Sequence, residues 1–450
     1  MLNFSILDII KTATTKAGSG CFKIQIINEL KLKLNDEKFI NKSRLLLNAF
    51  SRVRQLPFEA VVLFIIEKTT SSLSVSLSSF FSDSWSVPTK SSFSQARAFL
   101  CFKVFKRLNL WVLSHFYSQW NYRKWKGFRV LSIDGSTLRL PDHPTLQEKF
   151  SRHAFGAKKS VDRWMSRVSF LYDVLNEVVI DAQMESFDTS EATLCDQHLG
   201  FLRKGDLVIF DRYYASHYLF SVLLHKKVHF LFRMRDHSWK CVQSFIASGL
   251  KEDVVELNVY PYSKVAKKIP SNVNRVVKVR LIKQVTRSGE IRVYATSLLD
   301  KEVYTHTAII NLYKQRWGIE EAYKTLKARL DVIHFSGKTV KAVQQDFYAN
   351  VFLISLTSVL KADIKPSLKR KKQTKNKDGR IPMINNTFTI SQVKVLIKKI
   401  YHAFDEIKIW IERFNHLVKA AIEYSRKGQS NPRKSDKGHN RVFAQNYKNV

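Results

Sequence analysis

Cysteine is scarce in this chain. The 450 residues contain four cysteines, Cys21, Cys101, Cys195 and Cys241, which lie far apart and form no Cys-x-x-Cys pair. This spacing argues against a zinc site built on paired cysteines, and it provides no framework of disulfide bonds. We therefore expect reduced thiols and a fold held together by its core.

Long apolar runs are also missing. The longest are at 60–66 and 351–360, well short of the roughly 20 residues that a membrane helix needs. The first residues, Met1 to Ser5, show no charged segment followed by an apolar run and a cleavage site. We expect a protein that does not enter the membrane and that stays in the cytoplasm.

Acidic residues are few beside basic ones. The chain has 75 Lys and Arg against 38 Asp and Glu, a formal charge of +37, with a pI near 10. It is also 45% hydrophobic and 12% aromatic, so the charge belongs to a folded protein. Such a charge favours polyanionic partners, nucleic acid first among them. A basic ribosomal or membrane-surface protein is the rival interpretation.

The N-terminal part, 1–120, has apolar residues at helical spacing. Pro88 interrupts this pattern, and either Thr89 or Ser91 is placed to cap the next helix. A short helix, a turn and a second helix with basic residues are typical of a DNA-docking unit, but a plain helical bundle fits equally well. The outward face of the second helix is predicted to carry Lys90, Gln95 and Arg97.

The rest of the chain predicts an α/β core with an insertion. Apolar runs at 128–134 and 206–211 predict buried strands, and 167–183 predicts a hairpin that turns at Asn176. Thr305 is placed to cap a helix that runs to about Leu330. We expect five regions: a helical, possibly DNA-binding region at 1–120, the first part of the core at 121–235, a β-rich insertion at 236–303, the second part of the core at 304–362, and a basic linker, helical region and disordered tail at 363–450.

Two aspartates follow the buried strands. Asp134 ends the first run and precedes Gly135, and Asp211 ends the second. Open α/β sheets bind their ligands at the carboxyl ends of strands. A single aspartate there often only caps a turn, but two on equivalent strand ends could hold two Mg²⁺ ions about 4 Å apart.

A third carboxylate lies on the helix after the insertion. Tyr313, Arg316, Glu320 and Lys327 fall within an arc of roughly 60° at about 100° per residue, whereas Glu321 points elsewhere. One helix face therefore carries a ring, a guanidinium, a carboxylate and an ammonium group. Taken alone, this face is better explained as an ion-paired surface, because Arg316 and Glu320 are an i,i+4 pair.

These motifs resemble a known family. The runs Leu131–Asp142 and Val208–Tyr213, together with Tyr313-x2-Arg316-x3-Glu320-x6-Lys327, are similar to the three signatures of the DDE transposases of the insertion-sequence-four family. The resemblance covers roughly residues 85 to 360. It implies an RNase H-like mixed sheet flanked by helices, with a β-rich insertion and with helical N-terminal and C-terminal regions. The gaps of 211 − 134 = 77 and 320 − 211 = 109 residues leave room for the insertion after the second aspartate.

The resemblance also implies a function. A transposase of this kind binds transposon ends, cuts them and joins the freed 3′-OH to target DNA. Asp134, Asp211 and Glu320 would bind two Mg²⁺ ions, with Mn²⁺ as a substitute. The DNA-binding residues would be Tyr313, Arg316, Lys327 and, as the weakest candidate, Trp239, which could stack on a flipped base or be a core residue.

The same resemblance implies a homodimer in the DNA complex and association with the bacterial nucleoid. Two alternatives stay open. The chain could be a metal-dependent nuclease that cuts without joining, or an inactive remnant that only binds DNA. The intact set of three carboxylates argues against the remnant.

Overall fold

The computed structural model describes residues 19–51, 55–67, 71–155, 161–237, 239–258, 267, 269–365 and 381–425. The chain divides into two compact units that are each discontinuous in sequence. Unit 1 comprises Met1–Tyr122, Leu138–Ser166 and Lys324–Val450, and unit 2 comprises Arg123–Thr137 and Arg167–Tyr323. The basic block at 369–377 and the tail beyond 425, predicted as linker and disordered segment, lie outside the described residues.

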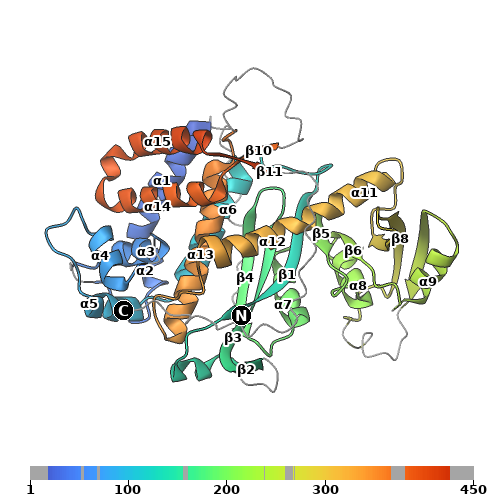
Figure 1. The fold of residues 1–450 in the computed structure, drawn as a ribbon, viewed down its shortest axis with the longest axis horizontal. Coiled ribbons are helices and arrows are strands. Elements are labelled where there is room, and N and C mark those ends of the chain that lie inside the picture. The colour runs from blue at the N-terminus through green and yellow to red at the C-terminus, as the bar shows by residue number, and fades with distance from the viewer. Residues whose placement is uncertain are drawn as a thin grey trace. The chain divides into compact units, whose positions relative to one another are not determined.

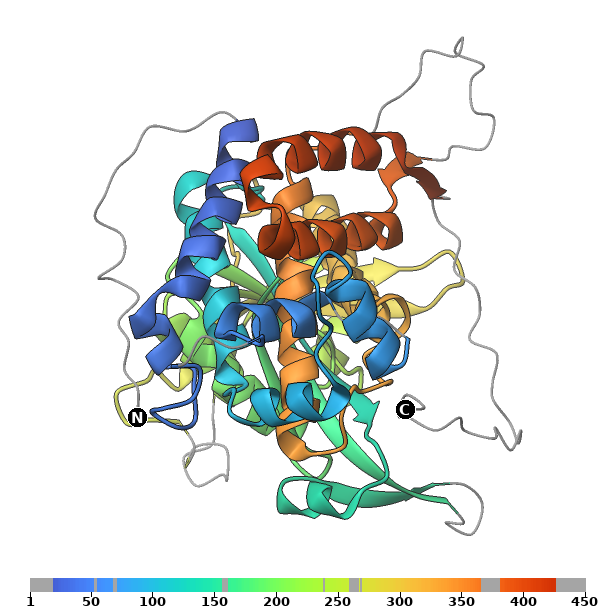
Figure 2. The same ribbon diagram turned by 90° about the vertical axis from the view of Figure 1, so that its left-hand side faces the viewer.

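Unit 1 is mainly helical (Figure 2). Its α-helices are α1 (Ser19–Asn35), α2 (Glu37–Asn41), α3 (Phe58–Glu67), α4 (Leu73–Phe80), α5 (Lys90–Ala98), α6 (Lys103–Gln119), α13 (Val340–Lys361), α14 (Asn386–His402) and α15 (Ile407–Ala420). The shorter elements are η2 (Pro144–Glu148), β2 (Ser151–Phe155), η6 (Thr325–Arg329), η7 (Phe404–Glu406) and the antiparallel pair β10 (Ile381–Ile384) and β11 (Ile422–Ser425). The helical N-terminal and C-terminal regions predicted from sequence are thus confirmed.

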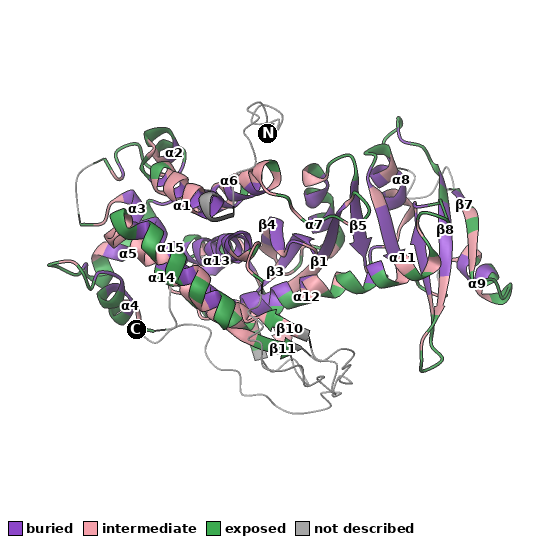
Figure 3. Cartoon of the chain, turned by 90° about the horizontal axis from the view of Figure 1, so that it is seen from above, coloured by how far each residue is buried: buried purple, intermediate pink, exposed green. Residues whose placement is uncertain are grey.

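Helix α13 is the central helix of unit 1. Residues 342–360 are buried around its whole circumference, as its colour in Figure 3 shows. It packs against α3, α5, α6 and α14, and its buried polar residues include Gln345 and Asp346. The apolar run at 351–360 is therefore a core segment, and none of the described helices is long and apolar enough to cross a membrane.

Helix α5 begins where the sequence predicts but presents a different face. The Thr89 side chain accepts a hydrogen bond from the Ser92 amide at 3.1 Å, so it caps the helix. Lys90 and Gln95 are exposed, as predicted. Arg97 was expected on the same outward face, but it is only 5% exposed and points into unit 1. The prediction is wrong for this residue because its partners lie on a distant part of the chain.

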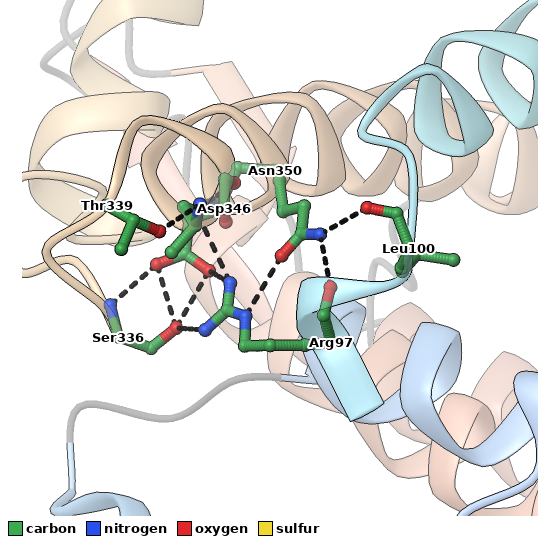
Figure 4. Close-up of polar contacts among 8 residues, drawn as sticks. Arg97, Leu100, Ser336, Thr339, Asp346 and Asn350 are labelled. Atoms are coloured by element: carbon green, nitrogen blue, oxygen red, sulfur yellow. Dashed lines mark hydrogen bonds and ion pairs between the residues drawn. The ribbon is translucent and has the colours of Figure 1, made fainter. Parts of the chain in front are cut away.

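Figure 4 shows the polar cluster around Arg97. Its guanidinium donates to Gln345 Oε1 at 2.9 Å, to Ser336 Oγ at 2.8 Å and to Asp346 Oδ1 at 3.2 Å. Gln345 in turn donates to the main-chain oxygens of Arg97 and Leu100. The cluster therefore ties the end of α5 to α13, and it uses every polar group of the arginine side chain.

Unit 2 is built on a mixed sheet. Its strands lie in the order β4, β3, β1, β5, β6, β9, β8, β7 (Figure 1). They are β1 (Arg129–Arg139), β3 (Val161–Asp173), β4 (Val178–Ser186), β5 (Asp206–Phe210), β6 (His229–Arg233), β7 (Glu252–Asn258), β8 (Val276–Val285) and β9 (Ile291–Thr296). The first residues of β3 pair with β2 within unit 1. The hairpin of β3 and β4 turns at 174–177, around the predicted Asn176.

The pairing directions confirm the predicted fold class. β1, β5 and β6 are parallel, whereas β9, β8 and β7 continue the sheet in antiparallel fashion. The described helical elements of unit 2 are α7 (Glu191–His198), η4 (Leu199–Phe201), α8 (His217–His225), α9 (Lys240–Ala247), α11 (His306–Tyr313), η5 (Lys314–Arg316) and α12 (Trp317–Lys324). This is an RNase H-like α/β arrangement with a β-rich insertion. Helix α9 lies within a stretch where no helical period was expected.

The register of β1 on β5 follows a constant offset. Arg129 pairs with Asp206 and Ser132 with Ile209, an offset of 206 − 129 = 77 residues. The first pair is also a buried, two-pronged ion pair, with N–O distances of 2.9 and 2.7 Å. Because a slip of one residue would send every side chain to the other face of the sheet, this ion pair helps to fix the register.

The segment after Thr305 is helical but not one regular helix. Thr305 occupies the N-cap position without a side-chain hydrogen bond, and the expected continuous helix is divided by the 3₁₀ turn η5. Further along, η6 is a π-helical turn in which the Leu330 amide donates to the Thr325 oxygen. The constant rotation of 100° per residue assumed from sequence therefore fails beyond α12.

Candidate catalytic carboxylate site

Asp134 lies where β1 leaves its pairing with β5. The strand continues to Arg139, so the prediction that Asp134 ends the strand is wrong. Burial nevertheless drops directly after Ile133, because β5 ends at Phe210 and no longer covers this side of β1. The Asp134 side chain is 22% exposed, and its Oδ1 accepts a hydrogen bond from the Gly135 amide at 2.9 Å.

Asp211 is level with Asp134 on the neighbouring strand. The two aspartates are 211 − 134 = 77 residues apart, which equals the register offset of β1 on β5. Asp211 follows the fully buried strand β5 directly, and its Oδ1 accepts from the Tyr213 amide at 2.6 Å. The parallel pairing, which stops at Ser132 and Ile209, therefore brings both carboxylates to the place where β1 and β5 separate.

Arg316 connects the third carboxylate to the first. Its guanidinium donates to Glu320 Oε1 at 2.7 Å and to Asp134 Oδ2 at 3.5 Å. The second distance is at the limit of a hydrogen bond, and the Nε atom is buried without a partner among the described residues. Arg316 thus holds Glu320 and Asp134 on either side of it, but its hydrogen-bonding capacity is not fully used.

The environment of Asp134 opposes its negative charge. The pKa of Asp134 is raised from 3.8 to about 6. Burial is the largest cause and the charges of Asp211 and Glu191 add to it, whereas Arg316 and the Gly135 amide act in the opposite direction. The favourable interactions of the Asp134 carboxylate with Arg316 and the Gly135 amide therefore do not offset the cost of burying its charge. Such a group is typical of a functional site.

Glu191 is a fourth carboxylate that sequence reasoning missed. It pairs with Arg167 at 3.0 Å and lies 3.4 Å from the Tyr214 hydroxyl. A Cβ atom added at Gly135 would come within 2.7 Å of its Cδ, so its side chain covers this glycine. In sequence Glu191 resembles any acidic residue in the first turn of a helix, and no signal distinguishes it.

Tyr313 and Lys327 belong to different units. Tyr313 is largely buried and packs on Tyr294 of β9 with ring centroids 4.6 Å apart. Burial raises the pKa of its hydroxyl well above the ordinary value. Lys327 is half-buried in the π turn η6 of unit 1, where burial lowers its pKa. Their roles toward DNA stay predictions.

Trp239 precedes α9 and is partly buried. Its ring lies 4.5 Å from His217 and 5.7 Å from Phe220, both of α8, and packs against the core of unit 2. This position accounts for the residue as a core contact. These contacts do not test the prediction that Trp239 stacks on a DNA base.

The acidic residues fit a divalent cation by their chemistry. Mg²⁺ prefers oxygen ligands, and Asp134, Asp211 and Glu320 supply only carboxylate oxygens. The raised pKa of Asp134 shows a charge that a cation would compensate. Among the described residues, no three acidic, histidine or cysteine side chains are close enough together to hold a metal ion at once. Arg316 lies between two of the carboxylates instead.

The fold and this arrangement define a class of protein: an RNase H-like domain that gathers acidic side chains at the ends of adjacent parallel strands. Comparison with known proteins gives the family. The sequence profile described as "Transposase DDE domain" matches residues 125–356, about half of the chain. The chain belongs to this family, which confirms the resemblance to the insertion-sequence-four DDE transposases.

A relative among characterised proteins agrees with this assignment. The chain is 24% identical over 236 residues to "Transposase InsG for insertion sequence element IS4" from Escherichia coli strain K12. The match covers 52% of this chain and 52% of the relative, so it spans about half the length of that protein. A solved structure, "Cryo-EM structure of piggyBac transposase synaptic complex with hairpin DNA", is 11% identical, with a TM-score of 0.45 over 88% of this chain and 84% of that one.

Proposed function

We propose that this protein is an active transposase of a bacterial insertion sequence. It would bind the DNA ends of the element, hydrolyse a phosphodiester at each end and join the freed 3′-OH to target DNA. The observation that carries the proposal is the shared offset of 77 residues, which sets Asp134 and Asp211 level on adjacent parallel strands. Arg316 then links Asp134 to Glu320.

Asp134, Asp211 and Glu320 would hold two Mg²⁺ or Mn²⁺ ions. Bound divalent ions supply activation of the attacking oxygen, stabilisation of the leaving oxygen and neutralisation of charge on the phosphate. The residues of the chain would position the substrate. Arg316, whose donors are incompletely used, could bind a phosphate in a two-pronged manner, and Tyr313 and Lys327 would contact the backbone nearby.

The remaining proposals concern the assembly. The excess of 75 basic over 38 acidic residues supports DNA as the partner, because every neutralised phosphate releases counterions. We expect a homodimer on paired transposon ends and, in the cell, association with the nucleoid. Trp239 remains the candidate for stacking on a base near the cleaved end.

The first experiment is cleavage of supercoiled plasmid that carries the DNA bracketing the gene. We expect nicking at the element's ends with Mn²⁺ or Mg²⁺ and none with EDTA. Joining of a pre-cut end to target DNA then separates the transposase from a nuclease, which would cut without joining. Binding to the ends without any metal-dependent cut would instead identify an inactive remnant.

A further inference from the structure

The main-chain oxygen of Asp134 receives hydrogen bonds from two side chains. The Tyr323 hydroxyl of α12 donates to it at 2.8 Å, and the Ser169 hydroxyl of β3 donates at 3.1 Å. A carbonyl oxygen has two lone pairs, so these two hydroxyls use both. The backbone of Asp134 is therefore fixed by side chains at the point where the pairing of β1 with β5 has ended.

The ring of Tyr323 is held in place by packing. It is buried and stacks on Phe170, with centroids 4.6 Å apart and planes 13° apart. Tyr323 lies three residues after Glu320 in α12. The Tyr323 hydroxyl therefore connects the helix that carries Glu320 to the main chain of Asp134.

Ser169 is supported from behind by two further buried groups. Its hydroxyl donates to the carbonyl of Asp134, and its oxygen lies 3.0 Å from His198 Nε2. His198 Nδ1 lies 2.8 Å from Asp181 Oδ2. Ser169, His198 and Asp181 are all at most 3% exposed. A buried series of hydrogen bonds stabilises the fold only when every polar group in it has a partner. This series ends at the main-chain oxygen of Asp134.

We propose that Tyr323 and Ser169 are positioning residues that fix the Asp134 backbone relative to Glu320 for divalent-cation binding, an inference that rests on the proposed function. Arg316 joins the two carboxylates through their side chains. Tyr323 joins the same helix to the same strand through the main chain. The two attachments together determine how far apart the carboxylates can be.

Tyr323→Phe is the most informative variant, because it keeps the ring and its stacking on Phe170 and removes only the hydroxyl. We expect the Mn²⁺ concentration at half-saturation, measured from the electron paramagnetic resonance of free Mn²⁺, to rise roughly five- to tenfold, as for a lost hydrogen bond of about 1 kcal/mol. Cleavage at limiting Mn²⁺ should fall by a similar factor and recover at excess Mn²⁺. Ser169→Ala should act in the same direction.

Tyr172→Phe is the matched control. Tyr172 is a buried tyrosine of β3 that lies beside Gly318 of α12, so this variant removes a buried tyrosine hydroxyl near the same helix and leaves the Tyr323 bond to Asp134 in place. We expect wild-type half-saturation in this variant. Wild-type half-saturation in Tyr323→Phe, or an equal rise in Tyr172→Phe, would overturn the inference.

Hydrogen exchange keeps the inference separate from the proposed function. We expect peptide amides at 133–138 to exchange faster in Tyr323→Phe than in the wild type, without any metal or DNA present, because the Asp134 backbone has lost a tether. If the wild type neither binds Mn²⁺ nor cuts DNA, the proposed function fails. The exchange rates at 133–138 still test whether Tyr323 holds the Asp134 backbone. Unchanged exchange would contradict it.

Discussion

Two arginines, one in each unit, pair with carboxylates in different ways. Arg97 in unit 1 is 5% exposed, and all three of its nitrogen atoms donate to partners that are themselves bonded (Figure 4). One partner is Asp346 Oδ1, and Asp346 Oδ2 accepts from the Ser336 amide. Arg316 in unit 2 has one close partner, Glu320, one distant partner, Asp134, and a buried Nε with none among the described residues.

The difference separates a fully satisfied ion pair from an incompletely satisfied one. A buried pair stabilises a fold only when its remaining donors and acceptors are satisfied, as they are around Arg97. A buried polar group left unsatisfied calls for an explanation, and a missing ligand is one. Arg316 is thus less completely paired than Arg97, and it contacts the carboxylate of Asp134, whose pKa is raised by burial.

The largest expected effect is on catalysis. Asp211→Asn and Glu320→Gln should each lower metal-dependent cleavage by a factor of about 10³ or more, because each removes a charged ligand without changing volume. End binding and thermal unfolding should change little. Plasmid nicking and gel-shift assays measure the two activities.

Glu321→Gln is the control for this prediction. Glu321 is the exposed neighbour of Glu320 on α12, and its variant should keep cleavage. A dead Glu321 variant beside an active Glu320 variant would mean that the wrong carboxylate has been assigned.

The second effect is on stability. Asp346→Ala leaves the Arg97 guanidinium buried without its carboxylate, and should lower the free energy of unfolding of unit 1 by about 3–5 kcal/mol. Denaturant unfolding measures this loss. In Asp142→Asn, which removes an exposed partner of Arg152 in the same unit, the change should stay within about 1 kcal/mol. Similar losses in both variants would remove the contrast between the two kinds of pair.

The third effect is a gain of stability in the metal-free protein. The pKa of Asp134 is raised by burial from 3.8 to about 6, so its stabilising contribution is present below pH 4 and is lost as the pH rises through 6. Asp134→Asn avoids this loss. We expect the variant to be more stable than wild type by up to about 3 kcal/mol above pH 7, with the difference vanishing near pH 4. A constant difference across this range in thermal unfolding would exclude burial of the Asp134 charge as the cause.

The smallest effect concerns Gly135. An added Cβ would come within 2.7 Å of Glu191 Cδ, so Gly135→Ala should destabilise unit 2 by about 1–3 kcal/mol through overpacking. Gly200→Ala is the control, because a Cβ there meets nothing within 4 Å. The double variant with Glu191→Ala should recover part of the loss, a coupling that denaturant unfolding detects. If the changes in unfolding free energy of the two single variants simply add in the double variant, the added Cβ and the Glu191 side chain do not compete for space.

The sequence predicted the parts of this molecule that rest on local patterns. The apolar runs identified β1 and β5, and the resemblance supplied Glu320. The gap of 77 residues between the aspartates was visible in the sequence, but only the structure shows that the same number sets the register of the two strands.

The parts that were missed depend on partners far away in sequence. Arg97 was placed on an outward face because its helix alone cannot reveal Asp346, 249 residues later. Tyr323 reaches Asp134 across 189 residues, and a tyrosine three positions after a glutamate carries no signal of that contact. A helical wheel likewise assumes a regular helix and cannot anticipate the turns η5 and η6.

The most direct test of the central claim is Mn²⁺ binding by the full chain, followed by electron paramagnetic resonance. The wild-type protein should bind Mn²⁺, Asp211→Asn should lose most of that binding, and Glu321→Gln should keep it. Binding of Mn²⁺ that is equal in all three proteins would show that the carboxylates at the ends of β1 and β5 are not the metal site.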